Sequence, residues 1–237
     1  MSVEFDVVDD PARACSAILL GAVMAGGHVM LTGGSTPRTA YQELAKAVRE
    51  MGIDTGDTVF WFGDERCVPP DDDRSNYKLA KEALFDPLAD VASLNVKRMP
   101  GELGHAEGAE AYERELEAAG RPTFELILLG LGPDGHMASL FPDQPTVHER
   151  SRLVVGVPEA GLEPFVPRIS LTLPGLARTR QIVFLAEGEK KADAVLAAFG
   201  PEAQPGPHVP ASLVPTVVND VQVILDPAAA ARLPGRE

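Results

Sequence analysis

The sequence predicts an α/β protein with a mainly parallel, Rossmann-like sheet and helices on both faces. Short runs rich in β-branched and aromatic residues recur along the chain, and several are apolar throughout, as strands covered on both faces are. Helical patterns lie between many of these runs, and such alternation favours a parallel sheet. The expected strands are residues 3–8, 28–32, 58–62, 124–130, 152–157, 168–173, 181–186 and 221–226.

Three segments have clear helical patterns. In "TPRTAYQELAKAVREMG", Thr36 suits the N-cap, Pro37 suits the first turn and Gly52 ends the helix. Segments 105–120 and 189–200 also end in glycine. The apolar face expected for the first helix consists of Tyr41, Leu44, Val48 and Met51.

The chain shows no sign of division into separate units. It has neither a Gly/Ser-rich linker nor an internal repeat, and the proline-rich stretch 200–215 is expected to cross the surface. Its 237 residues are enough to bury a core. We therefore expect one domain over residues 1–237.

The charge and composition exclude several classes of partner. Thirty-five acidic and 21 basic residues give a net charge of −14, which opposes binding to nucleic acid or an anionic membrane. No apolar run approaches the ~20 residues that span a bilayer, and the first ten residues do not resemble a signal peptide. Two cysteines, Cys15 and Cys67, form no disulfide framework or metal cluster. We expect a cytoplasmic protein, monomeric or weakly dimeric.

In parallel α/β sheets, ligands bind beyond the carboxyl ends of the strands. At one such end, in "MLTGGSTPRTAY", two glycines precede a helix. The helix N-terminus and the hydroxyls of Ser35 and Thr36 would suit a phosphate at Gly34. A plain strand-to-helix turn is about equally compatible with this pattern, and the stretch is neither a Walker A loop nor GxGxxG.

Two further strand ends carry ionisable residues. Asp64, Glu65 and Arg66 follow the strand at 58–62, and these residues could line a cleft or be solvated. In "LGLGPDGHMASLFP", Asp134 and His136 stand among glycines after the strand at 124–130. Histidine suits proton transfer near neutrality, and a neighbouring carboxylate can fix its tautomer. A packed or surface histidine is the alternative.

Cationic residues occur at two more positions of this kind. Arg168 opens a strand, and Lys190 and Lys191 begin a helix after Gly188. Lysine in a first helical turn opposes the helix dipole, so a bound anion would explain it. Exposed solubilising charge is the alternative. Taken together, these segments indicate chemistry on a small phosphorylated metabolite.

At these residues the chain closely resembles the 6-phosphogluconolactonase family. The segments "TGGSTPRTAY", "GDERCVPPDDDRSNY", "LGLGPDGHMASLFP", "PRISLT" and "GEKKADAV" occur in the family's order, and the similarity covers roughly residues 28–226. The resemblance implies the fold type shared with glucosamine-6-phosphate isomerases. It also implies hydrolysis of 6-phospho-D-glucono-1,5-lactone to 6-phospho-D-gluconate in the pentose phosphate pathway, without metal or cofactor.

The resemblance also assigns roles. His136 would be the general base that activates water for attack on C1, and Asp134 would orient its ring. Arg66 would line the lactone pocket, which Asp64 would organise. The 6-phosphate would be held by Gly34, Ser35, Thr36, Arg168 and Lys191, although the spacing leaves Lys190 open as an alternative to Lys191.

Two other functions are compatible with part of this pattern. Glucosamine-6-phosphate deaminases share the Asp-Gly-His turn but continue with an asparagine–glutamate pair, whereas this chain has "ASLFP" without a carboxylate. A sugar-phosphate sensor that has lost catalysis is the alternative from another class. Intact Asp134 and His136 argue against the sensor, so the lactonase is the expected function.

Overall fold

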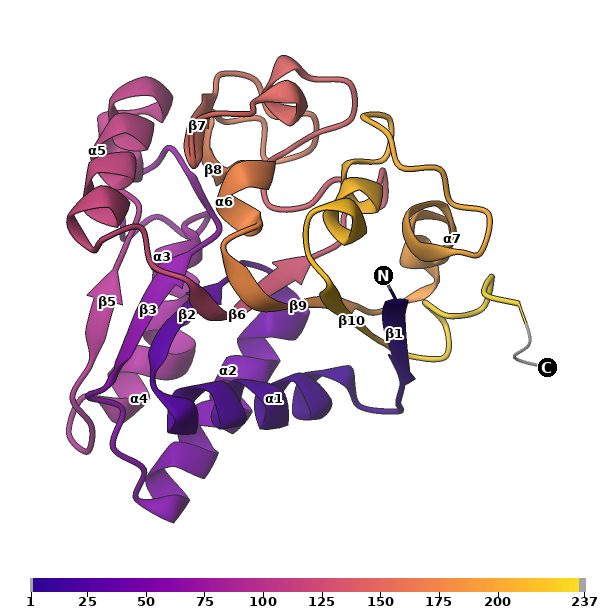
Figure 1. Cartoon of the computed structure of the whole chain (residues 1–237). Helices are drawn as coiled ribbons and strands as arrows, with labels where there is room; N and C mark the ends of the chain where they lie inside the picture. Colours follow the sequence, from indigo (N-terminus) through magenta and orange to yellow (C-terminus); the bar gives the residue numbers. More distant parts are fainter. Residues whose placement is uncertain (1, 235–237) are drawn as a thin grey trace.

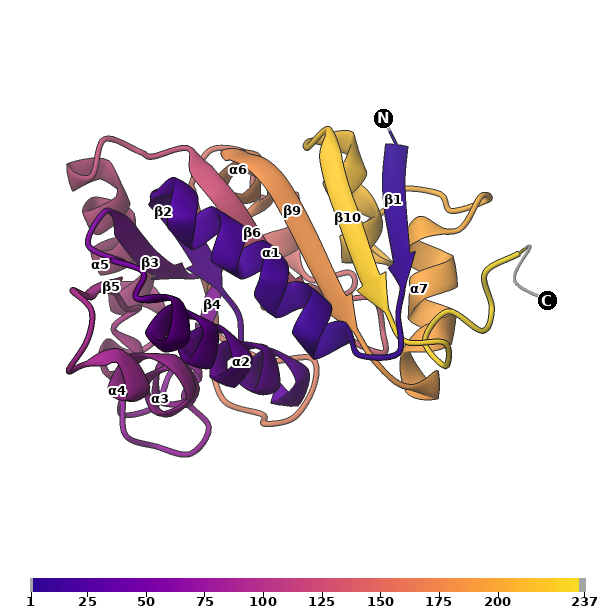
Figure 2. The ribbon, with the colours of Figure 1, turned by 90° about the horizontal axis from the view of Figure 1, so that it is seen from below.

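The computed structural model describes residues 2–234, and a seven-stranded parallel sheet forms its centre. The strand order is β1-β10-β9-β6-β2-β3-β5, and Figure 2 shows β6, β9, β10 and β1 side by side. These strands are β1 (Ser2–Val7), β2 (Gly27–Leu31), β3 (Thr58–Phe62), β5 (Asn95–Lys97), β6 (Phe124–Gly130), β9 (Thr179–Ala186) and β10 (Asp220–Leu225).

Helices cover both faces of this sheet, which confirms the predicted fold class. In Figure 1, α1 and α2 lie below the sheet, and α5, α6 and α7 lie above it. None of the helices within residues 2–234 has the length and apolar character needed to cross a membrane. The helices are α1 (Pro11–Ala25), α2 (Ser35–Met51), α3 (Asn76–Ala80), α4 (Asp86–Leu88), α5 (His105–Ala118), α6 (Leu173–Leu176) and α7 (Ala192–Phe199).

A second, antiparallel sheet in the order β4-β8-β7 stands apart from the central one. It consists of β4 (Asp64–Arg66), β7 (Val154–Val157) and β8 (Arg168–Leu171). The sequence predicted strands near β7 and β8 but not their separate sheet, and it did not predict β4. The pairing has a direct consequence for the site, because it sets Arg66 opposite Arg168.

Helix α2 differs from the expectation at both ends. Its N-cap is Gly34, not Thr36, and no side chain caps the helix; the Thr36 hydroxyl donates instead to Glu187 Oε2 at 2.9 Å. Gly52 ends the helix in the left-handed conformation, as predicted. Met51, expected on the buried face, is 59% exposed in the last turn.

The proline-rich stretch 200–215, expected to cross the surface, is partly buried. Its final part forms a short 3₁₀ helix, Pro210–Thr216, in which Ala211 and Val214 are buried. The Ala211 amide donates to the Gly135 carbonyl at 3.0 Å. This segment therefore packs against the turn that carries His136.

One partly buried polar contact joins β2 to β3. Trp61, the only tryptophan, donates from Nε1 to Nδ1 of His28 at 2.9 Å, so that nitrogen must be unprotonated. Burial lowers the pKa of His28, and the charge of Glu125 opposes this effect. The unfolded chain therefore takes up the His28 proton at a higher pH than the folded chain does.

We expect this histidine to make the fold less stable in mild acid. A lowered pKa in the folded state means that its contribution is complete above the unfolded pKa of about 6.5 and is lost as the pH falls below it. His28→Gln retains an acceptor for Trp61 and should flatten the pH dependence of the unfolding free energy between about pH 7 and pH 5. Urea unfolding followed by Trp61 fluorescence measures this. His208→Gln, at an exposed site, is the control, and equal slopes in both variants would contradict the prediction.

Candidate functional site

A pocket of about 300 Å³ lies at the carboxyl ends of β2, β3, β6 and β9. These strands are neighbours in the central sheet, so the turns that follow them meet at one edge. The pocket brings together almost the whole predicted set. Its lining includes Gly34, Ser35, Thr36, Asp64, Arg66, His136, Arg168 and Lys191. Asp134 does not line it but holds His136 from behind.

The turn after β2, residues 32–36, forms one wall and is called here the glycine turn. Tyr41 on α2 is fully buried and fixes the start of this turn, because its hydroxyl donates to the Thr32 carbonyl and accepts from the Thr32 amide. A Cβ on Gly33 would lie 1.9 Å from Asn76 Oδ1, so only glycine fits there. No side chain caps the N-terminus of α2, and its first residues line the pocket, where helix amides can bind an anion.

A carboxylate lies within this wall. Thr36 donates its hydroxyl proton to Glu187, which follows β9 and also lines the pocket. A hydroxyl has a single proton, so Thr36 cannot donate to Glu187 and to a bound anion at once. Glu187 therefore opposes anion binding at the glycine turn through both competition and charge.

Two arginines that line the pocket are cross-strand neighbours. Arg66 on β4 pairs directly with Arg168 on β8, and like charges across an antiparallel pair destabilise each other. Burial lowers the pKa of Arg168, and the charge of Arg66 adds to this effect, whereas the charge of Asp64 opposes it. The Nε of Arg66 is buried without an acceptor. An anion in the pocket would relieve the repulsion.

Arg168 also shapes the pocket wall. It is 3% exposed, and it donates to the carbonyls of Val166, Pro164 and Leu162. These bonds hold the segment 162–166, from which Leu162 and Glu163 line the pocket. Arg168 therefore acts on the shape of the site as well as on its charge.

Lys191 lines the pocket and contacts the segment that leads from β6 to His136. Its Nζ donates to the Leu131 carbonyl at 2.6 Å. Burial lowers the pKa of Lys191, and the nearby charge of Asp134 opposes this effect. Lys190 is exposed and does not line the pocket, so the structure favours Lys191 of the two candidates.

The turn after β6 presents His136 to the pocket. Asp134 Oδ1 lies 2.6 Å from His136 Nδ1 and also accepts the His136 amide, which leaves Nε2 available to accept a proton. Burial by itself would raise the pKa of Asp134. The hydrogen bond and the charge of His136 outweigh this effect, so the pKa of Asp134 is lowered. A Cβ on Gly132 would lie 2.0 Å from His136 Nδ1, so this glycine is required for the pair.

A second histidine–aspartate pair shows that the contact alone does not make a catalytic group. His208 Nδ1 and Asp143 Oδ1 also lie 2.6 Å apart, but the His208 side chain is 80% exposed, and neither residue lines the pocket. The His136 side chain is 18% exposed and packs against Phe141, with ring centroids 4.7 Å apart. His136 therefore differs from His208 in being partly enclosed and in lining the pocket that also holds Arg66, Arg168 and Lys191.

Several functional residues were not identified from the sequence. Asn76 and Ser139, both buried, donate to the two oxygens of the Asp64 side chain. Glu163 and Glu187 add carboxylates to the pocket. In the sequence, the only signal for these residues was that they lie in or near the segments that carry Asp64, His136, Arg168 and Lys191. Their contacts, such as Ser139 with Asp64, join residues far apart in the chain.

Glu65, between two pocket residues, has a structural role. It is 3% exposed and accepts hydrogen bonds from the Arg66, Asn76 and Tyr77 amides and from the Ser75 hydroxyl. Burial raises its pKa, and these hydrogen bonds oppose the shift. Glu65 thereby fixes the start of α3 and the position of Asn76.

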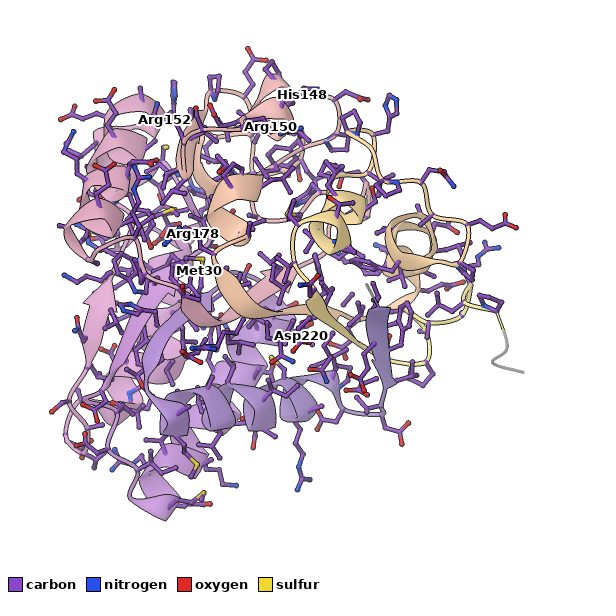
Figure 3. All side chains as sticks on the ribbon, in the orientation of Figure 1. Met30, His148, Arg150, Arg152, Arg178 and Asp220 are labelled. Atoms are coloured by element: carbon purple, nitrogen blue, oxygen red, sulfur yellow. The ribbon has the colours of Figure 1, made fainter. Side chains whose placement is uncertain are left out.

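Other cationic side chains lie elsewhere. Figure 3 shows His148, Arg150 and Arg152 in the upper part of the molecule, and none of them lines the pocket. Within residues 2–234, no group of three His, Cys, Asp or Glu side chains could hold a metal ion. What the pocket offers is an anion site beside a possible proton acceptor.

Residues 11–223 match the model of the family described as glucosamine-6-phosphate isomerases/6-phosphogluconolactonase. The chain belongs to this family. It is 40% identical to the 6-phosphogluconolactonase of Mycobacterium leprae over 217 residues, which cover 87% of this chain and 85% of that protein. The resemblance stated above is confirmed, and with it the expectation of an enzyme of the 6-phosphogluconolactonase type.

Solved structures of the family share this architecture. The 6-phosphogluconolactonase from Trypanosoma cruzi superposes with a TM-score of 0.83 at 28% identity, covering 99% of this chain and 98% of that one. A monomeric glucosamine-6-phosphate deaminase also reaches 0.83, at 18% identity, covering 98% of this chain and 100% of that one. The latter likeness concerns the fold alone.

Removing the charge of Glu187 should strengthen anion binding. Glu187→Gln keeps a possible partner for Thr36 but removes the repulsion, so the Kd for inorganic phosphate should fall by about two- to fivefold, the range for an exposed charge contact. Isothermal titration calorimetry at low salt measures this. Glu189→Gln removes an exposed charge two residues away that does not line the pocket and should change little. Equal or weaker binding by Glu187→Gln would contradict the prediction.

Proposed function

We propose that the chain hydrolyses 6-phospho-D-glucono-1,5-lactone to 6-phospho-D-gluconate in the oxidative pentose phosphate pathway. The observation that carries the proposal is the Asp134–His136 pair, with its 2.6 Å contact, in a pocket that also holds an uncapped helix N-terminus, Arg66, Arg168 and Lys191. A phosphorylated lactone needs both features: an anion site for the phosphate and a base near the carbonyl. The named relatives support the same activity.

In the proposed mechanism, His136 acts as the general base. Its Nε2 takes a proton from water, and the resulting hydroxide attacks C1 of the lactone. The tetrahedral oxyanion then collapses, the bond from C1 to the ring oxygen breaks, and the imidazolium returns its proton to that oxygen. Asp134 keeps the imidazole in the required tautomer and stabilises its cationic form.

We assign the phosphate to the glycine turn and the cations. Backbone amides near Gly34, the hydroxyls of Ser35 and Thr36, and Lys191 would hold its oxygens. Arg168 and Arg66 would counter the charge of the phosphate, and Asp64 would organise the lactone pocket. Glu187 would have to release Thr36 when the phosphate enters.

The other expectations for this chain stay proposals. We propose that it acts as one domain, monomeric or weakly dimeric, in the cytoplasm. The three cations are confined to the pocket of a chain whose net charge is −14, and this supports a small anionic substrate over nucleic acid or a membrane.

A deaminase is the second candidate, because the pocket does contain carboxylates. Asp64, Glu163 and Glu187 line it, although the stretch 139–141 has none. The two activities separate in one pair of assays. Freshly generated 6-phosphogluconolactone should be hydrolysed well above its spontaneous rate, and glucosamine 6-phosphate should release no ammonia. The reverse result would replace the proposal.

His136→Ala should reduce lactone hydrolysis by about 10²- to 10⁴-fold, the usual contribution of general acid–base catalysis, while 6-phosphogluconate still binds. Proton release in a weakly buffered pH-indicator assay, corrected for the spontaneous reaction, measures the rate. His208→Ala removes the exposed member of the other histidine–aspartate pair and should retain full activity. Normal turnover in His136→Ala would remove His136 from this role.

Lys191→Ala should raise both the KM for the lactone and the Kd for inorganic phosphate by about tenfold, since a charge-assisted hydrogen bond to phosphate is lost. Turnover should change less, because the phosphate is bound equally in the ground and transition states. Lys190→Ala, the adjacent exposed lysine, is the matched control. If Lys190→Ala had the larger effect, the assignment of the phosphate ligand would be wrong.

A further inference from the structure

Ser139 makes a buried contact that none of the roles above explains. Its side chain is fully buried, and its hydroxyl donates to Oδ2 of Asp64 at 2.6 Å, joining residues 75 positions apart. A hydroxyl–carboxylate hydrogen bond of this length is charge-assisted and strong. It ties the turn that carries His136 to strand β4, which carries Asp64 and Arg66.

The backbone around Ser139 holds the hydroxyl in place. The Ser139 amide donates to the Ser170 hydroxyl at 3.1 Å, and that hydroxyl donates to the Leu171 carbonyl. The preceding residue, Ala138, has a φ of 48°, which turns the chain sharply at this point. Ser139 is therefore anchored to β8 and not only to Asp64.

Asn76 holds the other side of Asp64. Its Nδ2 donates to Asp64 Oδ1 at 3.0 Å and to the Asp64 carbonyl at 2.9 Å. Each carboxylate oxygen thus receives one protein donor, while a carboxylate has about four acceptor sites. Asp64 is 5% exposed and lines the pocket. The remaining acceptor capacity is available to hydroxyl groups of a ligand.

We propose that Ser139 is a positioning residue that orients Asp64 to accept hydrogen bonds from the sugar hydroxyls. It thereby selects a polyhydroxylated ligand, whereas the glycine turn and Lys191 select its phosphate. The inference rests on the proposed function for the identity of that ligand. An acidic side chain at 139 would face Asp64 and repel it, so a hydroxyl suits this position.

The experiment compares binding of two probes to the intact chain. Ser139→Ala should raise the Kd for 6-phosphogluconate by about tenfold, as expected when a hydrogen bond to a charged group is lost, and leave the Kd for inorganic phosphate unchanged. Ser139→Cys, which keeps a weak donor of similar size, should be intermediate. Ser212→Ala removes another buried hydroxyl, which bonds only within residues 206–212, and controls for lost stability.

A double-mutant cycle tests whether Ser139 acts through Asp64. In an Asp64→Ala background, which removes the acceptor, Ser139→Ala should cause no further loss of 6-phosphogluconate affinity. An equal loss in both backgrounds, a parallel loss of phosphate binding, or the same effect from Ser212→Ala would overturn the inference. If the wild type binds 6-phosphogluconate and shows this pattern but does not hydrolyse the lactone, only the proposed function fails.

Discussion

The common direction of neighbouring strands is the constraint on which the site depends. Strands β9, β6, β2 and β3 lie side by side and run parallel, so their carboxyl ends share one edge of the sheet. The turns after them supply Lys191, His136, the glycine turn and Asp64, respectively. No single turn holds a complete chemistry. The shared edge combines an anion site with a proton acceptor.

The pocket contains cationic side chains although the chain as a whole is strongly acidic. A chain of net charge −14 repels anions at long range, and only local cations in a partly enclosed site overcome this. The antiparallel pairing of β4 and β8 provides two of them by setting Arg66 against Arg168. Asp64 moderates their repulsion from within the pocket, and Glu187 weakens anion binding at the glycine turn. In the proposed function, the affinity for the phosphate is a balance of these charges.

The fold by itself does not select the reaction. A deaminase at 18% identity has nearly the same architecture, so specificity must lie in the side chains at the strand ends. In this chain the group opposite Asp64 is the hydroxyl of Ser139, not a carboxylate. Asp64 is thereby held between two donors, Ser139 and Asn76, and in the proposed mechanism His136 acts as the base. This division suits hydrolysis, which needs one base and a water molecule.

The sequence by itself determined the layered α/β fold, all strands of the central sheet except β5, and the two turns that carry Gly34 and His136, because periodicity and glycine punctuation are local signals. It also determined the family, through motifs that extend over most of the chain. Only the tertiary structure decided which side chains meet. The Asp64–Ser139 and Thr36–Glu187 bonds join residues 75 and 151 positions apart, and the β4–β8 pairing joins Arg66 to Arg168. Such contacts depend on strand order and register, which no local pattern encodes.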